Sequence, residues 1–294
     1  MAIKNYFQLT KFGIIVFVLL TGLAGYGISY NPVQDYDFFH VILLIIGLYF
    51  LSSGSFALNQ TQEWKLDSLM PRTQKRPIPS GLVAPWQGFL IGILAVVCGS
   101  FLLYLLNPTT CYLGLATVVL YNGMYTMYWK KHWAFGAVPG AIPGAMPVVI
   151  GYSANNPSVI NPECFYLFLI MFFWQMPHFW ALAIRYKEDY EKGGFPVLPA
   201  IIGVPKTLYQ IGLYTFAYVA IAVASPWFVH AHLVYCLIVL PFACLVMYQF
   251  AKYYQSGGRK KWLGFFLTTN FSMLAFVAAP VVDKWIYLIT NQTF

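Results

Sequence analysis

The sequence predicts an all-α protein that crosses a membrane several times, as a single domain over residues 1–294. Hydrophobic residues make up 60% of the chain and charged residues only 9%. A helix needs ~20 mostly apolar residues to cross the ~30 Å hydrocarbon layer, and only helices or closed barrels satisfy the backbone there. The long apolar runs lack the period-two alternation of strands, which favours helices.

Nine apolar segments are long enough to be membrane helices. They cover residues 12–29, 38–58, 87–106, 110–129, 134–152, 163–184, 206–226, 229–251 and 262–281. The fifth contains Pro139, Pro143 and Pro147 at helical spacing, so we expect it to be kinked or interrupted. The working prediction is therefore a bundle of about nine transmembrane helices.

The first segment follows Lys4 and Lys11, as the apolar part of a signal peptide would, but no small-x-small cleavage site comes after it. We therefore expect a retained helix. The N-terminal stretch is neither Arg-rich nor Ser-rich, unlike an organelle transit peptide. A bacterial inner membrane is the predicted location.

The basic residues predict the orientation. With the N-terminus in the cytoplasm, the nine-helix prediction puts every Lys and Arg on the inner side except Lys284. The positive-inside rule expects this asymmetry over short loops. The net charge of +8 is thereby explained by a lipid bilayer and requires no nucleic-acid partner.

The inner acids follow two even-numbered segments, which end on the same side of the membrane. Glu63 and Asp67 follow the second segment, and Glu188, Asp189 and Glu191 follow the sixth. We expect the two acidic groups to face each other across one cavity near the cytoplasmic side.

Asn59, Glu63 and Asp67 are spaced i, i+4, i+8, so they project from one face of a helix. An amide and two carboxylates can converge on a hard cation, and Mg²⁺ is commonly held by one or two carboxylates plus substrate phosphates. Ionisable groups at the end of a membrane helix are expensive unless they line a polar cavity. The alternative is a solvated loop at the membrane edge.

Three bases follow directly: Arg72, Lys75 and Arg76. Arg forks match phosphate oxygens, and Lys adds a point charge. Pro71 is expected to end the helix before them. These bases predict a polyanion site beside the cation site, with positive-inside anchoring as the alternative.

His178 and Arg185 are seven residues apart near the end of the sixth segment, so they share a helix face. A histidine inside a membrane helix is a functional candidate, and a neutral imidazole can ligate iron or accept a proton. The alternative is a packing histidine that bonds to a neighbouring helix.

These residues resemble a known family. Asn59, Glu63 and Asp67 are similar to the first motif of the UbiA superfamily of intramembrane prenyltransferases, Asn-x-x-x-Asp-x-x-x-Asp, with Glu at the middle position. The resemblance implies a helical bundle around a central cavity, open near the cytoplasmic side. It also implies Mg²⁺ at these three residues, with Asp189 contributing from the opposite side.

Within that superfamily the chain resembles the protohaem IX farnesyltransferase branch. The similar stretches are residues 70–81, 177–184 and 194–199, with a middle region at 120–145 that brings in Lys130. This branch joins farnesyl diphosphate to haem b, giving haem o for terminal oxidases.

The resemblance assigns roles to the candidate residues. It implies catalytic and metal-binding roles for Asn59, Glu63, Asp67 and Asp189. It implies contacts to the diphosphate for Arg72, Lys75, Arg76 and Lys130. It implies contacts to the haem for His178 and Arg185. Haem a synthase or a terminal oxidase is an implied partner.

Two other functions remain open. The second Asp-x-x-x-Asp pattern of quinone-pathway relatives is broken, because Arg185 stands four residues before Asp189. This argues against an aromatic or quinone precursor as acceptor without excluding one. A secondary transporter is the other alternative, since broken helices with polar sites are typical of that class.

Overall fold

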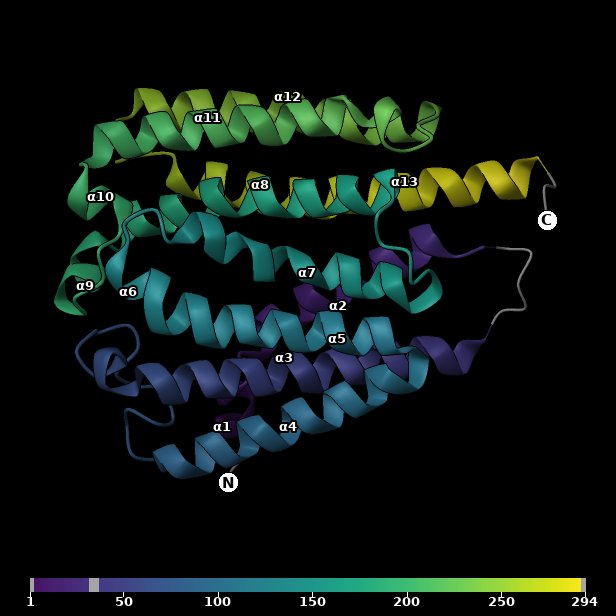
Figure 1. The fold of residues 1–294 in the computed structure, drawn as a ribbon. Helices are drawn as coiled ribbons and strands as arrows, with labels where there is room; N and C mark the ends of the chain where they lie inside the picture. The colour runs from purple at the N-terminus through teal and green to yellow at the C-terminus, as the bar shows by residue number, and fades with distance from the viewer. Residues whose placement is uncertain (1–2, 32–36, 292–294) are drawn as a thin grey trace.

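The computed structural model describes residues 3–31 and 37–291, and within these ranges it contains helices and loops without a β-strand. The long helices lie side by side, roughly parallel (Figure 1). The α-helices are α1 (Ile3–Leu9), α2 (Phe12–Ser29), α3 (Phe38–Asp67), α4 (Pro85–Leu106), α5 (Pro108–Val118), α6 (Lys130–His132), α7 (Ala137–Asn155), α8 (Pro162–Arg185), α9 (Lys187–Lys192), α10 (Leu198–Ile201), α11 (Val204–Val223), α12 (Leu233–Gln255) and α13 (Trp262–Thr290). A π-helix, η1 (Val119–Trp129), continues α5, and a 3₁₀ turn, η2 (Ser225–Trp227), follows α11.

Seven of the described helices are long and apolar enough to cross a membrane: α2, α3, α4, α7, α8, α12 and α13. The protein is therefore a multi-pass membrane protein. The other two expected spans are helical, as α5 with η1 and as α11, but they are not among these seven. The count of nine spans remains a prediction.

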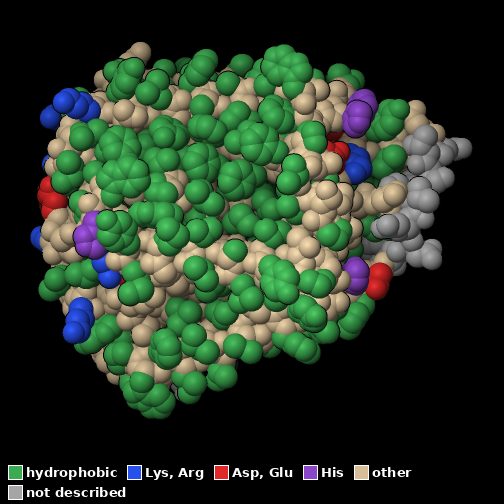
Figure 2. Space-filling model, in the orientation of Figure 1, with side chains coloured by type: hydrophobic (Ala, Val, Ile, Leu, Met, Phe, Trp, Pro, Cys, Tyr) green, Lys and Arg blue, Asp and Glu red, His purple; other side chains and the backbone are tan. Residues whose placement is uncertain are grey.

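The surface has an apolar middle and a charged end. Figure 2 shows hydrophobic side chains across the centre and most of the visible Lys and Arg at the left, where α6, α9 and α10 lie in Figure 1. The C-terminal ends of α3 and α8 both lie at this end. The acidic groups at these two helix ends therefore share one end of the bundle, and their meeting across one cavity stays a prediction.

Glycines let the helices that position the site approach closely. A Cβ on Gly54 of α3 would lie 2.6 Å from the carbonyl oxygen of Gly92 on α4, and a Cβ on Gly151 of α7 would collide with the backbone of Gly22 on α2. Small residues allow membrane helices to pack this closely, which matters because in lipid there is no hydrophobic driving force for helix association. The packing fixes α3 against α4, and α7 against α2.

Two helices differ from the prediction. The segment 134–152 was expected to be kinked or interrupted; α7 is continuous over Pro143 and Pro147, so it is not interrupted, and the kink stays a prediction. It is packed against both α2 and α8, and such neighbours make proline tolerable in membrane helices. The segment 119–129 was expected to be ordinary α-helix, but it is a π-helix.

Candidate functional site

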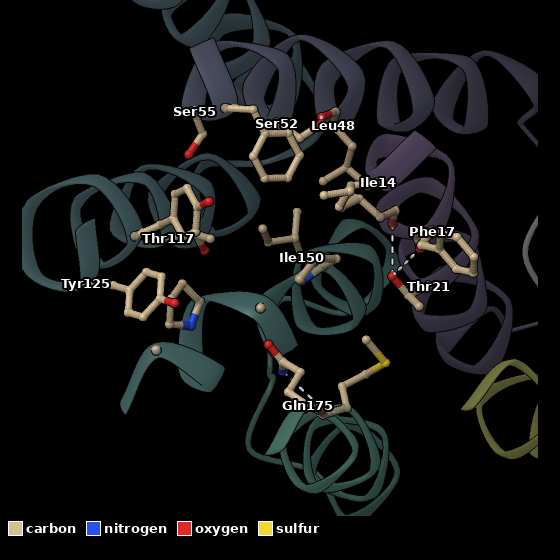
Figure 3. A pocket seen from close by; sticks show the side chains of 18 of the residues that line it. Ile14, Phe17, Thr21, Leu48, Ser52, Ser55, Thr117, Tyr125, Ile150 and Gln175 are labelled. Carbon is tan, nitrogen blue, oxygen red and sulfur yellow. Dashed lines mark hydrogen bonds between the residues drawn. The ribbon is translucent and has the colours of Figure 1, made fainter. Parts of the chain in front are cut away.

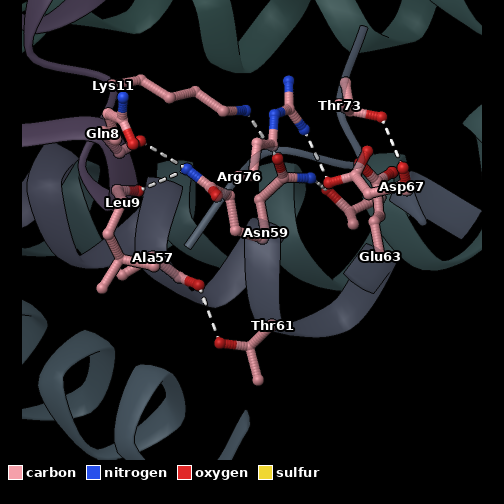
Figure 4. A network of polar contacts seen from close by, with 12 residues as sticks. Gln8, Leu9, Lys11, Ala57, Asn59, Thr61, Glu63, Asp67, Thr73 and Arg76 are labelled. Carbon is pink, nitrogen blue, oxygen red and sulfur yellow. Dashed lines mark hydrogen bonds and ion pairs between the residues drawn. The ribbon is translucent and has the colours of Figure 1, made fainter. Parts of the chain in front are cut away.

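The last turns of α3 carry a buried polar face. Asn59, Glu63 and Asp67 are each 1% exposed and project from the same side of the helix, as their spacing predicted (Figure 4). α3 continues to Asp67, nine residues beyond the expected apolar segment. The polar group therefore sits on a rigid helix rather than on a loop.

Each carboxylate is held by a basic side chain from another segment. Lys130 Nζ lies 2.8 and 2.7 Å from the two carboxylate oxygens of Glu63. Arg76 Nη1 donates to Asp67 Oδ2 over 2.6 Å. Asn59 Nδ2 donates to the hydroxyl of Thr126 on η1. These contacts tie α3 to η1, α6 and the loop that follows α3.

Lys11 completes the group and was missed from the sequence, where it looked like an anchor before the first membrane helix. Its Nζ donates to Asn59 Oδ1 over 2.7 Å (Figure 4). Burial, reinforced by the positive charges of Arg76 and Lys130, lowers the pKa of Lys11 to about 7. Its sequence signal was weak, because any basic residue at a helix start fits the positive-inside rule.

The bases exceed the acids in this cluster, which we call the α3 cluster: Asn59, Glu63 and Asp67 with Lys11, Arg76 and Lys130. Three basic side chains face two buried carboxylates. The negative charge of a polyanion that binds together with a metal ion would be well neutralised there. The burial of Lys130 alone would lower its pKa, but the neighbouring Glu63 carboxylate outweighs this and raises it.

The oxygen atoms of the α3 cluster are suitable ligands for Mg²⁺. One amide oxygen and two buried carboxylates lie on one helix face, and each already accepts a hydrogen bond from a basic side chain. Hard oxygen ligands of this kind suit Mg²⁺. Among residues 3–31 and 37–291, no group of three or more His, Cys, Asp and Glu side chains surrounds a metal position.

The segment that carries Asp189 packs over the end of α3. The Arg72 guanidinium lies 5.5 Å from the Tyr186 ring and 5.8 Å from the Tyr190 ring, and Lys130 Nζ lies 4.7 Å from the Phe195 ring. Asp189 itself makes no hydrogen bond or ion pair with the α3 cluster among the described contacts. Its role as a metal ligand remains a prediction.

The predicted bases have different surroundings. α3 ends at Asp67, before Pro71, so Arg72 and Arg76 do not share a helix face. Turns bring Arg76 back onto Asp67, whereas Arg72 and Lys75 stay exposed. The structure thus brings Arg76 and Lys130 into the α3 cluster and leaves Arg72 and Lys75 at its outer edge.

An apolar cavity of about 350 Å³ lies next to the α3 cluster, lined mainly by residues of α2, α3, α5, η1, α7 and α8 (Figure 3). Ser55 and Phe56, one turn before Asn59, line its wall, and Lys11 Nζ lies 5.3 Å from the Phe56 ring. The polar side chains of the lining are few: Thr21, Ser52, Ser55, Thr117, Tyr121, Tyr125, Gln175 and His178.

The π-helix η1 forms one wall between the cavity and the α3 cluster. Asn122 is buried and bonds Ser55 on α3, while Tyr121 and Tyr125 line the cavity. π-helical turns are frequent at functional sites. No sequence signal that we used distinguishes such a helix from an ordinary one.

Gln175 presents an oxygen to the cavity. Its amide nitrogen donates to the carbonyls of Ala141 (3.0 Å) and Met171 (2.9 Å), so the amide oxygen points away from them. That oxygen lies where Gly144 leaves room, because a Cβ there would collide with it. Figure 3 shows Gln175 at the edge of the cavity. It was not singled out from the sequence.

His178 and Arg185 do not share a pocket. His178 lines the cavity, with its ring between those of Trp174 (4.9 Å) and Phe266 (4.7 Å). Arg185 lies 5.9 Å from the Trp262 ring and lines a different pocket. His178 therefore lies beside the cavity, whereas Arg185 lies in a different pocket.

Comparisons with known proteins identify similar sequences. Residues 18–274 match the UbiA prenyltransferase family. A protoheme IX farnesyltransferase of Bdellovibrio bacteriovorus is 51% identical over 290 residues, covering 99% of each chain. A protoheme IX farnesyltransferase of Leptospira biflexa is 38% identical over 213 residues, covering 72% of this chain and 74% of the relative.

Solved structures share the fold. A digeranylgeranylglyceryl phosphate synthase superposes with a TM-score of 0.76 at 19% identity, covering 95% of this chain and 98% of the other. A UbiA homologue from Archaeoglobus fulgidus, bound to GPP and Mg²⁺, superposes with a TM-score of 0.69 at 15% identity, covering 95% and 99%.

Proposed function

This chain belongs to the UbiA prenyltransferase family, and on that premise we propose that it transfers a farnesyl group from farnesyl diphosphate to haem b, giving haem o and diphosphate. The observation that carries the proposal is the full-length similarity to the Bdellovibrio protoheme IX farnesyltransferase. The buried α3 cluster beside an apolar cavity supports it physically. One part suits a diphosphate and the other an isoprenoid chain.

The diphosphate end belongs at the α3 cluster. Arg76 and Lys130 can form charge-assisted hydrogen bonds to phosphate oxygens, and Lys11 adds a third basic donor. Asn59, Glu63 and Asp67 would hold Mg²⁺, which neutralises charge on a leaving diphosphate. The exposed Arg72 and Lys75 stand where an incoming polyanion meets the protein, with Asp189 on the facing segment.

The isoprenoid chain belongs in the cavity. Breaking the carbon–oxygen bond of farnesyl diphosphate leaves an allylic cation, and an apolar enclosure keeps bulk water from it. Tyr121 and Tyr125 line the cavity next to the α3 cluster, where their ring faces suit a cation. Bond formation with a haem vinyl carbon then moves the positive charge onto the haem side chain.

Water completes the reaction by adding to that second cation and losing a proton. Gln175 offers an acceptor oxygen in an otherwise apolar wall, which suits a water or the new hydroxyl group. His178 is our candidate for contact with the haem iron. Arg185 is a weaker haem candidate than the sequence implied, because it lines another pocket.

We place the enzyme in a bacterial inner membrane with its N-terminus and the α3 cluster on the cytoplasmic side. The basic end of the bundle supports this orientation. A diphosphate from the cytoplasm would then reach the site directly. Haem a synthase or a terminal oxidase would receive the product.

The acceptor is tested with labelled farnesyl diphosphate. Purified protein in liposomes is incubated with haem b or with hydroxybenzoate, each with Mg²⁺ or with a chelator. We expect label in haem only, and only with Mg²⁺. Label in hydroxybenzoate would transfer the assignment to the quinone branch, and flux across the liposome without any transfer would favour a transporter.

A further inference from the structure

A second pocket lies at the basic end of the bundle, away from the cavity. It has a volume of about 910 Å³ and is bounded by the ends of α8 and α12 and the beginnings of α11 and α13. Its charged lining residues are Arg185, Arg259 and Lys261, and no carboxylate lines it. We call it the α12–α13 pocket.

The positive-inside rule explains how many bases lie at this end but not how they are arranged. Some basic side chains at this end pair with acids, as Lys130 does with Glu63 and Lys187 with Glu191, whereas others, such as Lys131, do not pair with any described residue. In the described part of the chain, the three bases of the α12–α13 pocket enter no ion pair. Their charges converge on one hollow without internal compensation.

The loop that carries two of these bases has a defined geometry. After α12, Gly257 has a φ of +64°, and its N–H donates to the carbonyl of Tyr254 over 2.9 Å. The N–H of Gly258 donates to the carbonyl of Tyr253 over 3.3 Å. This pair of bonds is the Schellman ending of a helix. The pocket wall is thereby ordered before any ligand arrives.

Part of the remaining wall is apolar and aromatic: Ile184, Val204 and Pro205 line it, with the indole of Trp262. Gln255 and Ser256 of the α12 end complete the lining. Trp262 is held by its Nε1, which donates to the carbonyl of Ala181 over 3.1 Å, and by stacking on Phe266. The pocket therefore combines a cationic side with a fixed apolar side, which suits an amphiphile with a negative head.

The position of the pocket identifies the amphiphile. The membrane-spanning helices α8 and α12 end at it, and α13 begins there. Their shared end is the level of the lipid headgroups. Basic pockets between membrane helices on the cytoplasmic side bind anionic headgroups. We propose that the α12–α13 pocket binds the phosphate headgroup of an anionic phospholipid, with the acyl chains along the apolar wall.

The test uses the full-length protein in detergent, titrated with phosphatidylglycerol, with phosphatidylcholine or with inorganic phosphate, and native mass spectrometry counts bound molecules. The test variant is Arg259→Gln/Lys261→Gln. The control Lys4→Gln/Lys252→Gln removes two exposed bases that do not line the pocket. Circular dichroism shows whether both variants are folded.

We expect wild type and control to prefer phosphatidylglycerol. The test variant should bind it roughly 30-fold more weakly, the effect of two bases near a lipid surface. Equal binding of both lipids by wild type, or an unchanged preference in the test variant, would refute the site. Inorganic phosphate competing at the same concentration as the lipid would make it a phosphate site instead and overturn the lipid assignment. A further variant, Arg185→Gln, removes one charge from the pocket. It should weaken the binding of phosphatidylglycerol by about the factor that each single charge contributes in the test variant.

Discussion

At the residue scale, the two carboxylates of the α3 cluster depend on their basic partners. Glu63 is 1% exposed and bonds Lys130 through both oxygens. Removing one partner of a buried pair leaves an uncompensated charge, which costs more than the pair itself contributes. The cluster is thus held in shape without a substrate, and in the proposed reaction its charges would become available when a metal–diphosphate complex replaces these contacts.

Lys130→Met should destabilise the protein by about 3 kcal/mol, because Glu63 would be left buried without its partner. Thermal unfolding in detergent measures the change. Lys131→Met is the matched control, since the neighbouring Lys131 enters no ion pair among the described residues. Equal melting temperatures for the two variants would mean that the Glu63 pair adds no stability.

Lys11→Met should raise the KM for farnesyl diphosphate by roughly tenfold to a hundredfold, the range for one charge-assisted hydrogen bond. The reason is the loss of the amine that lies beside Asn59 and faces the polyanion site. Steady-state kinetics at saturating haem give the value, and exposed Lys4→Met should leave KM unchanged. An unaltered KM in Lys11→Met would return Lys11 to a purely anchoring role.

His178→Ala should weaken haem binding while diphosphate binding is retained. His178→Phe separates ligation from packing, because a phenyl ring can keep the stacking with Trp174 and Phe266 but has no nitrogen. Haem titration by absorbance is the measurement. If His178→Phe binds haem like wild type, the residue acts through packing alone.

The sequence could predict the members of the α3 face because helical spacing alone puts Asn59, Glu63 and Asp67 together. It could not predict the pairing of Lys11 with Asn59, since that contact joins residues 48 positions apart. Gln175 was equally hidden, because only the neighbouring α7 reveals which way its amide points.

At the element scale, close helix contacts position the cluster. α3 and α4 touch at Gly54, where a side chain would meet the backbone of Gly92 and Val96. The apolar segments and most helix ends follow from composition and periodicity. The continuous α7 and the π-helix do not, because neighbouring helices decide whether a proline-rich segment breaks and how tightly a helix winds.

Gly54→Leu should lower stability by about 1–3 kcal/mol, the usual range for overpacking, and should reduce farnesyl transfer by displacing α3. Gly13→Ala is the control, since a Cβ at Gly13 has no neighbour within 4 Å and alanine favours the helix. Thermal unfolding and transfer assays are run on both. Wild-type stability in Gly54→Leu would contradict the close α3–α4 packing.

At the whole-molecule scale, the proposed reaction would use the charged end for the diphosphate and the apolar cavity for the isoprenoid chain. Membrane insertion, the basic end and the location of both acidic groups at one end of the bundle could all be predicted from charge and hydropathy. Charge and hydropathy leave the number of spans undecided, because α5 with η1 and α11 are not among the helices that are long and apolar enough to cross a membrane. They do not reveal the acceptor either, because the cavity is lined by helices distant in sequence. The expectation of haem came from the resemblance of the motifs, and a relative that is 51% identical over 99% of each chain supports it.

The mass of haem extracted after reaction tests the central claim most directly. Purified protein is incubated with farnesyl diphosphate, haem b and Mg²⁺, alongside folded Asp67→Ala. We predict haem carrying a hydroxyethylfarnesyl group from wild type and unmodified haem from Asp67→Ala. Unmodified haem from wild type would contradict the proposed function, and wild-type turnover by Asp67→Ala would contradict the α3 cluster as the metal–diphosphate site.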